Sequence, residues 1–271
     1  MTHAGTPETG LVIVAHGERN TSTGNRTLLA HAARVAVRWP RIFVQAAVLY
    51  GEPSLKRAWK AAAERGVRDL LLYPFFMTDG YIVEQLLARR ILSSPDLNVT
   101  LMPPLGLDPR LPSLLLEESL RAADAAGYLP DETQLLVAAH GSRLAKDASA
   151  AIAQIAAALQ SHNVFADAKP AYLDHRPLLR EALENRERPM VVAGCFAGEG
   201  AHARRDVPTA IARAGTNAAY TGPIGAHPEV TDLIIDAFAE KLGQPWFAAI
   251  GQDPSSGTRI GLQPSRCGPR G

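Results

Sequence analysis

Two histidines that each end a run of apolar residues are the residues of this sequence best placed to do chemistry. His16 ends the segment 11–16, His140 ends the segment 135–140, and a glycine follows each of them. Such apolar runs are typical of buried parallel strands, and α/β proteins bind their ligands at the carboxyl ends of these strands. A neutral imidazole in that place can bind a transition metal or accept a proton near neutral pH.

A third histidine, His202, lies in a loop after another apolar run, 189–195. In alternating β-α units with right-handed crossovers, the first and third strands usually lie side by side. We therefore expect His140 and His202 to face each other although they are far apart in the sequence. Two imidazoles on loops over strand ends would form an open site for a divalent transition metal.

The copy of this pattern in the first half of the chain is incomplete. When Gly80 is aligned with Gly200, Ile82 stands where His202 stands and Leu86 stands where Asp206 stands. An isoleucine neither binds a metal nor moves a proton. The sequence therefore predicts a single site, centred on the second half, for which the first half provides a wall, with one extra ligand from the first half left open.

Strands and helices that alternate must position these histidines. In the first half we expect strands near 10–15, 42–49, 69–75 and 98–102, with helices near 23–38, 54–65, 81–92 and 109–126. In the second half we expect strands near 134–139, 166–173, 189–195 and 217–221, with helices near 146–161, 177–187, 206–214 and 228–243. The pattern predicts an α/β fold of two similar Rossmann-like halves, each a parallel four-stranded sheet flanked by helices, with a cleft between them.

The repeat also predicts how the chain is divided. His16 and His140 are 124 positions apart, and so are Pro53 and Pro177, each at the expected start of a helix. We expect a flexible N-terminus over 1–9, a first half over 10–127 and a second half over 128–250 that carries the metal motif. Residues 251–271 are rich in Gly, Pro and Ser without a period, which predicts a disordered tail.

Composition excludes several classes of protein. With 28 basic and 27 acidic residues the net charge is +1, which gives no general reason to expect a nucleic acid or a membrane as partner. Two cysteines, Cys195 and Cys267, fit neither a disulfide framework nor a four-cysteine zinc cage, as is typical of a reducing compartment. No signal peptide or membrane-spanning run is recognisable, so we expect a cytoplasmic protein, either a monomer or a homodimer.

Two motifs of the second half resemble those of a known family. Ala139-His140-Gly141-Ser142-Arg143 and the segment 200–208, which reads Gly-Ala-His-Ala-Arg-Arg-Asp-Val-Pro, are similar to motifs of the class II tetrapyrrole chelatases. Within this class, the sequence most resembles the sirohydrochlorin cobaltochelatases and ferrochelatases, over about residues 10–243. The resemblance implies a lyase that inserts a divalent metal, Co²⁺ or Fe²⁺ with Ni²⁺ or Zn²⁺ also open, into sirohydrochlorin or a related tetrapyrrole. It implies a role in cobalamin or siroheme biosynthesis and no organic cofactor.

The resemblance also implies roles for individual residues. His140 and His202 would hold the metal and accept protons from the pyrrole nitrogens. A third ligand or base with a carboxylate is expected, with Glu84 as the first candidate and Glu199 or Asp174 as alternatives. Asp206 would orient His202, as residues behind metal-binding histidines commonly do. For substrate binding, the candidates are Arg143, Arg204, Arg205 and His16, since a polycarboxylate tetrapyrrole can pair with guanidinium groups.

Two other functions fit parts of the pattern. A metal carrier without catalysis would need the same histidines but no space for a tetrapyrrole. A phosphohistidine enzyme also carries His-Gly after its first strand, but preceded by arginine, whereas Ala15 and Ala139 precede the histidines here. Without that arginine a phosphoryl group would be poorly neutralised.

His175, at the expected start of a helix, is an acid, a base or a cap.

Overall fold

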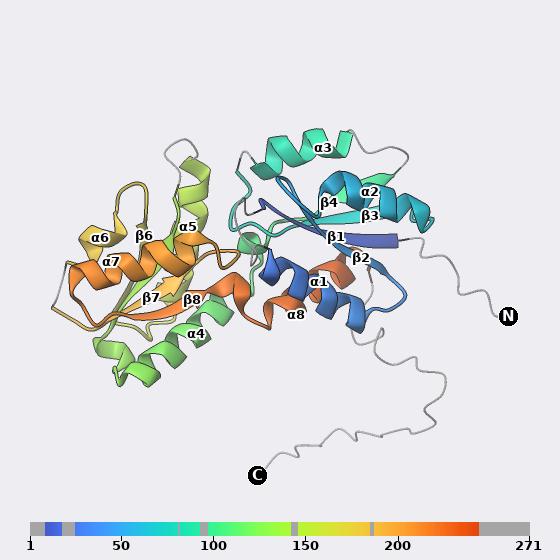
Figure 1. Ribbon diagram of the computed structural model, residues 1–271. Coiled ribbons are helices and arrows are strands. Elements are labelled where there is room, and N and C mark those ends of the chain that lie inside the picture. Colours follow the sequence, from blue (N-terminus) through green and yellow to red (C-terminus); the bar gives the residue numbers. More distant parts are fainter. Residues whose placement is uncertain are drawn as a thin grey trace, which may run out of the picture.

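The fold consists of two α/β halves, as Figure 1 shows for a computed structural model of the chain. The structure describes residues 9–17, 25–80, 82–92, 97–141, 146–184 and 187–243. Each half contains a four-stranded parallel sheet, with strand orders β2-β1-β3-β4 and β6-β5-β7-β8. The predicted class of two similar Rossmann-like halves is confirmed, and so is the pairing of the first strand of each half with the third.

Strands and helices of the first half alternate as the hydrophobic periodicity predicts. The elements are β1 (Thr9–Ala15), α1 (Arg26–Arg38), β2 (Phe43–Val48), α2 (Leu55–Glu64), β3 (Asp69–Pro74), η1 (Ile82–Leu87), α3 (Ala88–Leu92), β4 (Asn98–Leu101), η2 (Leu105–Leu107) and α4 (Leu111–Ala126). The π-helical turn η1 leads into α3. Because both faces of β1 are covered, its residues from Leu11 to Val14 are fully buried, which explains the continuous apolar run.

The second half repeats this order. Its elements are η3 (Pro130–Glu132), β5 (Gln134–Ala139), α5 (Lys146–Ser161), β6 (Asp167–Tyr172), α6 (Leu179–Ala182), β7 (Met190–Gly194), η4 (His202–Asp206), α7 (Val207–Ala214), β8 (Ala219–Pro223), η5 (Ile224–Ala226) and α8 (Val230–Lys241). The prediction of a helix over 177–187 was too long, because α6 makes only one helical turn. A π-helical turn, η4, precedes α7 as η1 precedes α3.

The last helices of the two halves pack on the opposite half. Helix α4 contacts β7, β8 and α5, whereas α8 contacts α1 (Figure 1). The expected boundary near residue 127 separates the two repeats along the chain, but the packing units exchange their final helices across it. Among the described ranges, no helix is both long enough and apolar enough to cross a membrane.

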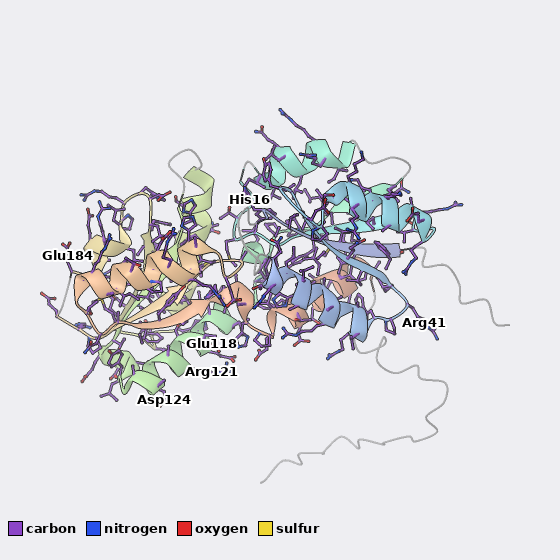
Figure 2. The ribbon with its side chains drawn as sticks, viewed as in Figure 1. His16, Arg41, Glu118, Arg121, Asp124 and Glu184 are labelled. Carbon is purple, nitrogen blue, oxygen red and sulfur yellow. The ribbon has the colours of Figure 1, made fainter. Side chains whose placement is uncertain are left out.

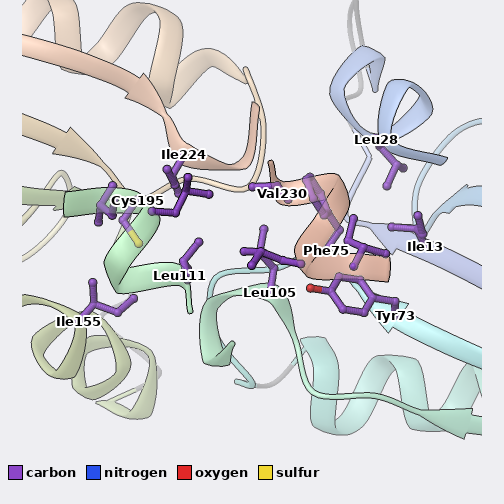
Figure 3. Close-up of a cluster of buried hydrophobic side chains, with 14 of the residues drawn as sticks. Ile13, Leu28, Tyr73, Phe75, Leu105, Leu111, Ile155, Cys195, Ile224 and Val230 are labelled. Carbon is purple, nitrogen blue, oxygen red and sulfur yellow. The ribbon is translucent and has the colours of Figure 1, made fainter. Parts of the chain in front are cut away.

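One hydrophobic cluster runs through both halves as a consequence of this exchange. It includes Ile13 and Phe75 of the first half together with Ile155 and Ile224 of the second (Figure 3). Two further clusters cover the outer face of each sheet separately. Burial of apolar surface therefore holds the halves to each other as well as each half together.

The carboxyl edges of the two sheets meet at a pair of sulfur atoms. Met77 follows β3, Cys195 directly follows β7, and the Cys195 Sγ lies 3.7 Å from the Met77 Sδ. Burial raises the pKa of the Cys195 thiol to about 12, so the group is a neutral core residue and not a metal ligand. This contact places the loops that follow β3 and β7 against each other.

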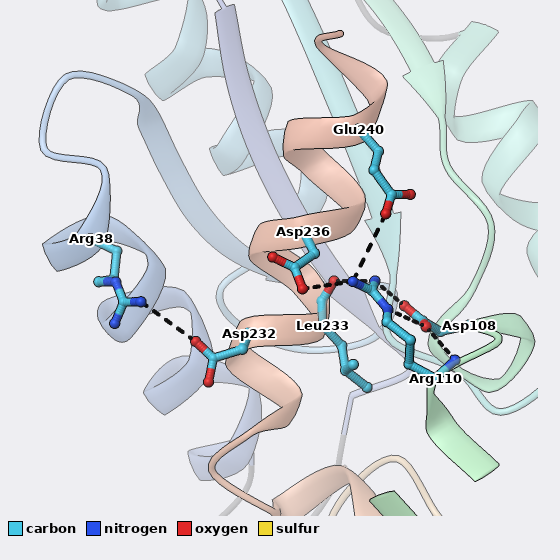
Figure 4. Close-up of polar contacts among 7 residues, drawn as sticks. All are labelled: Arg38, Asp108, Arg110, Asp232, Leu233, Asp236 and Glu240. Atoms are coloured by element: carbon cyan, nitrogen blue, oxygen red, sulfur yellow. Dashed lines mark hydrogen bonds and ion pairs between the residues drawn. The ribbon is translucent and has the colours of Figure 1, made fainter. Parts of the chain in front are cut away.

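Charged side chains also join the two exchanged helices. Arg110, directly before α4, donates to Asp108 and to Asp236 of α8, with nitrogen–oxygen distances of 2.7 and 2.6 Å (Figure 4). The Asp108 side chain is only 6% exposed, so the guanidinium compensates a nearly buried carboxylate. The hydrogen bond that Arg110 donates to Asp108 is the main reason that the pKa of Arg110 is raised.

A buried histidine fastens helix α1 to the second half. The Nε2 of His31 donates to the Gly225 carbonyl and its Nδ1 accepts from the Thr231 hydroxyl, both at 2.8 Å. A carbonyl can only accept, so the proton lies on Nε2 and the ring is neutral. Burial lowers the pKa of His31. The Gly225 carbonyl acts in the opposite direction, whereas Arg34 and His227 lower the pKa further.

This histidine makes stability depend on pH. The folded state holds His31 neutral, whereas the unfolded chain protonates it near pH 6.5, so stability is complete above that pH and is lost as the pH falls below it. We expect His31→Gln, which cannot titrate but keeps a donor for Gly225, to show a weaker decrease in unfolding free energy between about pH 7 and 5. Urea unfolding at several pH values measures this. Parallel pH profiles of the two proteins would contradict it.

Candidate metal centre

His140 and His202 lie together, as their sequence contexts predict. The strand β5 ends at Ala139 directly before His140, and η4 begins at His202 after the neighbouring strand β7. Their imidazole rings are stacked, with centroids 4.2 Å apart and planes at 23°. Both side chains are about half exposed, 49% for His140 and 48% for His202, so the pair is open to an incoming ion.

Asp206 holds His202 in the tautomer that a metal ligand needs. The two residues are four apart in η4, and His202 Nδ1 lies 2.8 Å from the Asp206 Oδ2. Because a carboxylate only accepts, Nδ1 carries the proton and the lone pair of Nε2 is available. Partial burial raises the pKa of Asp206, but hydrogen bonds from Arg205 and His202 outweigh it, so the net pKa is lowered and the carboxylate is charged.

Asp174 lies on the other side of His140. Its Oδ2 is 3.5 Å from His140 Nε2, a distance longer than a hydrogen bond. Two ligands that share one metal at about 2.1 Å each lie about 3.0–3.5 Å apart, which matches this spacing. Burial and the nearby His202 lower the pKa of His140, although Asp174 and Asp206 act in the opposite direction. His140 is therefore neutral, as a metal ligand or proton acceptor must be.

The candidate ligands His140, His202 and Asp174 lie near one another, but their ligand atoms do not converge on one point. Among the described side chains, no three His, Cys, Asp or Glu residues are arranged closely enough to hold a metal ion. Because the rings of His140 and His202 are stacked face to face, their nitrogen atoms do not point toward a common position. A rotation of one ring about its side-chain bonds would be needed to bring both nitrogens to one ion. Both rings are about half exposed.

His175 packs against residues next to His140. Its ring stacks on Tyr172 with centroids 4.1 Å apart, and its Nε2 lies 2.9 Å from the Ser149 hydroxyl. Gly141 has a φ of +80°, and a Cβ there would lie 2.4 Å from the His175 Nδ1. Only glycine therefore fits after His140, which explains the His-Gly pair in structural terms. The sequence predicts an acid, a base or a cap at His175, and in the structure this side chain packs against Tyr172 and Gly141.

Two of the proposed arginines already have acidic partners. Arg204 donates to Glu199 at 2.7 Å, and the Arg205 Nε donates to Asp206 at 2.9 Å. Glu199 is thus engaged by Arg204. Arg143 lies outside the described residues, and so does the side chain of Glu84, whose backbone belongs to η1.

His16 lies apart from the stacked pair, in the corresponding position of the first half. Its ring contacts Tyr50 with centroids 5.0 Å apart and planes at 47°, and its Nδ1 lies 3.1 Å from the Gly17 carbonyl. Ile82 begins η1 as His202 begins η4, so an alkyl side chain occupies the position that corresponds to the second imidazole. The prediction of an incomplete first copy is consistent with this arrangement.

Asp174, one of the two alternatives to Glu84 for the carboxylate, lies near His140 in the structure. It follows β6 as His140 follows β5, so a signal was present: a carboxylate directly after a predicted strand that neighbours the first. Glu84 was ranked first because it stands two residues beyond the position that corresponds to His202. The structure places Asp174 beside His140, whereas the side chain of Glu84 lies outside the described residues.

Comparison with known proteins is decisive at the level of the family. The CbiX family model matches the chain twice, over residues 10–122 and 134–241. A solved structure of CbiX, described as the terminal enzyme for biosynthesis of siroheme in denitrifying bacteria, is 31% identical. The alignment covers 87% of this chain and 100% of that one, with a TM-score of 0.73. The chain belongs to the CbiX family.

More distant structures share the fold of this CbiX-family chain. SirB from Bacillus subtilis with Fe³⁺ is 16% identical with a TM-score of 0.73, over 88% of this chain and 98% of that one. DR2241 from Deinococcus radiodurans, a multi-domain protein, is 22% identical with a TM-score of 0.68, over 87% of this chain and 55% of that one. Among curated protein sequences, none matches this chain significantly. The double match of the family model agrees with the internal repeat.

Proposed function

We propose that this CbiX-family chain is a chelatase that inserts Co²⁺ or Fe²⁺ into sirohydrochlorin, for cobalamin or siroheme biosynthesis. The observation that supports this most is the stacked pair of His140 and His202 at the adjoining ends of β5 and β7. The family match and the 31% identity with a CbiX of siroheme biosynthesis support the same substrate class. Ni²⁺ and Zn²⁺ stay open, because imidazole and carboxylate ligands accept all of these ions.

In the proposed reaction, a divalent metal replaces two protons on the pyrrole nitrogens. His140 and His202 present the metal to one face of the macrocycle and accept the protons as the metal–nitrogen bonds form. The lowered pKa of His140 keeps it neutral and able to do so near neutral pH. Asp206 fixes the proton of His202 on Nδ1 and leaves Nε2 for the ion.

Binding of the substrate carboxylates would use guanidinium groups near the site. Arg204 and Arg205 are exposed, and each is paired with a carboxylate, Glu199 and Asp206 respectively. Surface pairs of this kind have a low net stability, so exchange of Glu199 for a substrate carboxylate is energetically accessible to Arg204. We also propose Arg143 and His16 as contacts of the substrate, as the resemblance of the sequence to the family implies.

We further propose Asp174 as the oxygen ligand, on the strength of its distance to His140. Asp174→Asn keeps the shape and removes the charge, and we expect it to weaken Co²⁺ binding about 10- to 100-fold. The competing candidate is Glu84, for which Glu84→Gln is the matched change. Titration of both variants with Co²⁺ decides between them. Wild-type affinity in Asp174→Asn together with weak binding in Glu84→Gln would assign the ligand to the first half.

An insertion assay tests the proposed function. Sirohydrochlorin is mixed under anaerobic conditions with Co²⁺, Fe²⁺ or Ni²⁺, and its absorption is followed with and without the protein. We expect faster insertion of at least one of Co²⁺ and Fe²⁺ with the protein present than without it. Tight metal binding without any acceleration would instead identify a metal carrier and contradict the proposal.

A further inference from the structure

The first half carries a different set of side chains at the positions that correspond to the metal centre. Tyr50 corresponds to Asp174, because the amide of each donates to the carbonyl of the histidine that ends the first strand, at 3.0 and 3.2 Å. Ile82 corresponds to His202, since each begins a π-helical turn after the third strand. The first half has therefore a phenol and an alkyl side chain where the second half has a carboxylate and an imidazole.

Tyr50 and His16 form an accessible aromatic pair. Their ring centroids are 5.0 Å apart, and Tyr50 is 37% exposed. Within the described ranges, it is the one aromatic residue among the exposed large hydrophobic side chains. The pair of Tyr50 and His16 therefore lacks the carboxylate that favours a cation at the metal centre, and it offers an aromatic face instead.

The aromatic pair lies at the same junction as the metal centre. The contact of Met77 with Cys195 joins the carboxyl edges of the two sheets. The strands β1 and β5 are the direct neighbours of β3 and β7, and neighbouring strands are about 4.8 Å apart. His16 and His140, at the ends of β1 and β5, therefore both lie one strand from that contact. Figure 2 shows His16 on the side of the first half that faces the second.

We infer that Tyr50 and His16 are a stacking surface for the tetrapyrrole macrocycle, on the face opposite to the one that receives the metal. This assignment rests on the proposed function, because it requires a tetrapyrrole substrate. Aromatic rings bind planar π-systems by offset stacking or edge-to-face contact, and such pairs add affinity beyond the buried area. The two copies of the repeat then divide the work: the second half presents the ion, and the first half holds the macrocycle against it.

The test measures the two affinities separately. Metal-free sirohydrochlorin is titrated into wild type, Tyr50→Ala and Tyr50→Phe, and Co²⁺ is titrated into the same proteins without tetrapyrrole. We expect Tyr50→Ala to raise the Kd for sirohydrochlorin at least about fivefold with an unchanged Kd for Co²⁺, and Tyr50→Phe to stay within about twofold of wild type. Val37→Ala is the control, because Val37 is an exposed large apolar residue of α1, 79% exposed.

The outcomes separate this inference from the proposed function. If wild type inserts metal and Tyr50→Ala binds sirohydrochlorin with the wild-type Kd, the stacking surface is wrong and the chelatase proposal stands. An equal loss in Val37→Ala, or a parallel loss of Co²⁺ affinity in Tyr50→Ala, would also overturn it. If wild type binds no sirohydrochlorin, the proposed function fails and this inference fails with it.

Discussion

Replacement of His202 by alanine is expected to lower the rate of metal insertion by at least about 100-fold, the effect of losing a proton acceptor in the transition state. His202 combines two tasks in the proposed reaction, because its Nε2 is free for the ion while Asp206 holds the proton on Nδ1. His140→Ala is expected to have an effect of the same order, since the two rings are stacked against each other. Steady-state insertion of Co²⁺ into sirohydrochlorin measures both.

His162→Ala is the matched control for these variants. His162 is an exposed histidine just after α5, and its loss removes an imidazole without touching the stacked pair. We expect it to insert metal at the wild-type rate. Because His140 and His202 are half exposed, their removal should leave the fold intact, which circular dichroism checks. Wild-type insertion by His202→Ala would contradict the site assignment.

Asp206→Asn is expected to lower the affinity for the metal by about 10- to 100-fold. Asparagine keeps the shape of the side chain but removes the charge that stabilises His202 Nδ1–H, and it weakens the bond from Arg205. The lone pair of Nε2 then becomes less basic, and the ring is less firmly oriented. Titration with Co²⁺, followed by the visible absorption of the bound ion, measures the loss.

The control for Asp206→Asn is Asp232→Asn. Asp232 is an aspartate of α8 whose pair with Arg38 is long, 3.8 Å, and exposed, so its loss removes one surface charge without affecting a histidine. We expect no change in Co²⁺ affinity for this variant. Equal losses in the two variants would mean that Asp206 acts only through the overall charge of the surface.

The positions of His140 and His202 could be predicted because they depend on local patterns and one topological rule. Continuous apolar runs identified β5 and β7, and the right-handed crossover made these strands neighbours. The repeat of His16 at His140 and of Pro53 at Pro177 fixed how the halves correspond. None of this required knowledge of side-chain packing.

The exchange of α4 and α8 could not be predicted in the same way. Periodicity shows that a helix has an apolar face, but it does not say which sheet that face covers. Leu114 and Leu115 of α4 would satisfy either half, and the choice depends on the loops after β4 and β8 and on Arg110 meeting Asp236. Hydrophobic patterns in the sequence do not specify such tertiary partners.

The roles of some residues near the site depend on tertiary contacts in the same way. Asp174 is near His140 only because β6 pairs with β5, and that adjacency had not been used to rank carboxylates. The sequence offers His175 as an acid, a base or a cap, and its packing against Gly141 and Tyr172 follows only from the tertiary structure. Tyr50 and Asp174 are also 124 positions apart, and the matching backbone bonds to His16 and His140 support this correspondence.

The position of the ion itself tests the central claim most directly. Crystals of the full chain soaked in Co²⁺ and measured at the cobalt absorption edge would show where the metal binds by its anomalous signal. The account predicts one site per chain, with cobalt within about 2.3 Å of the Nε2 atoms of His140 and His202. A cobalt bound to His16, or none at the His140–His202 pair, would contradict a single metal centre in the second half.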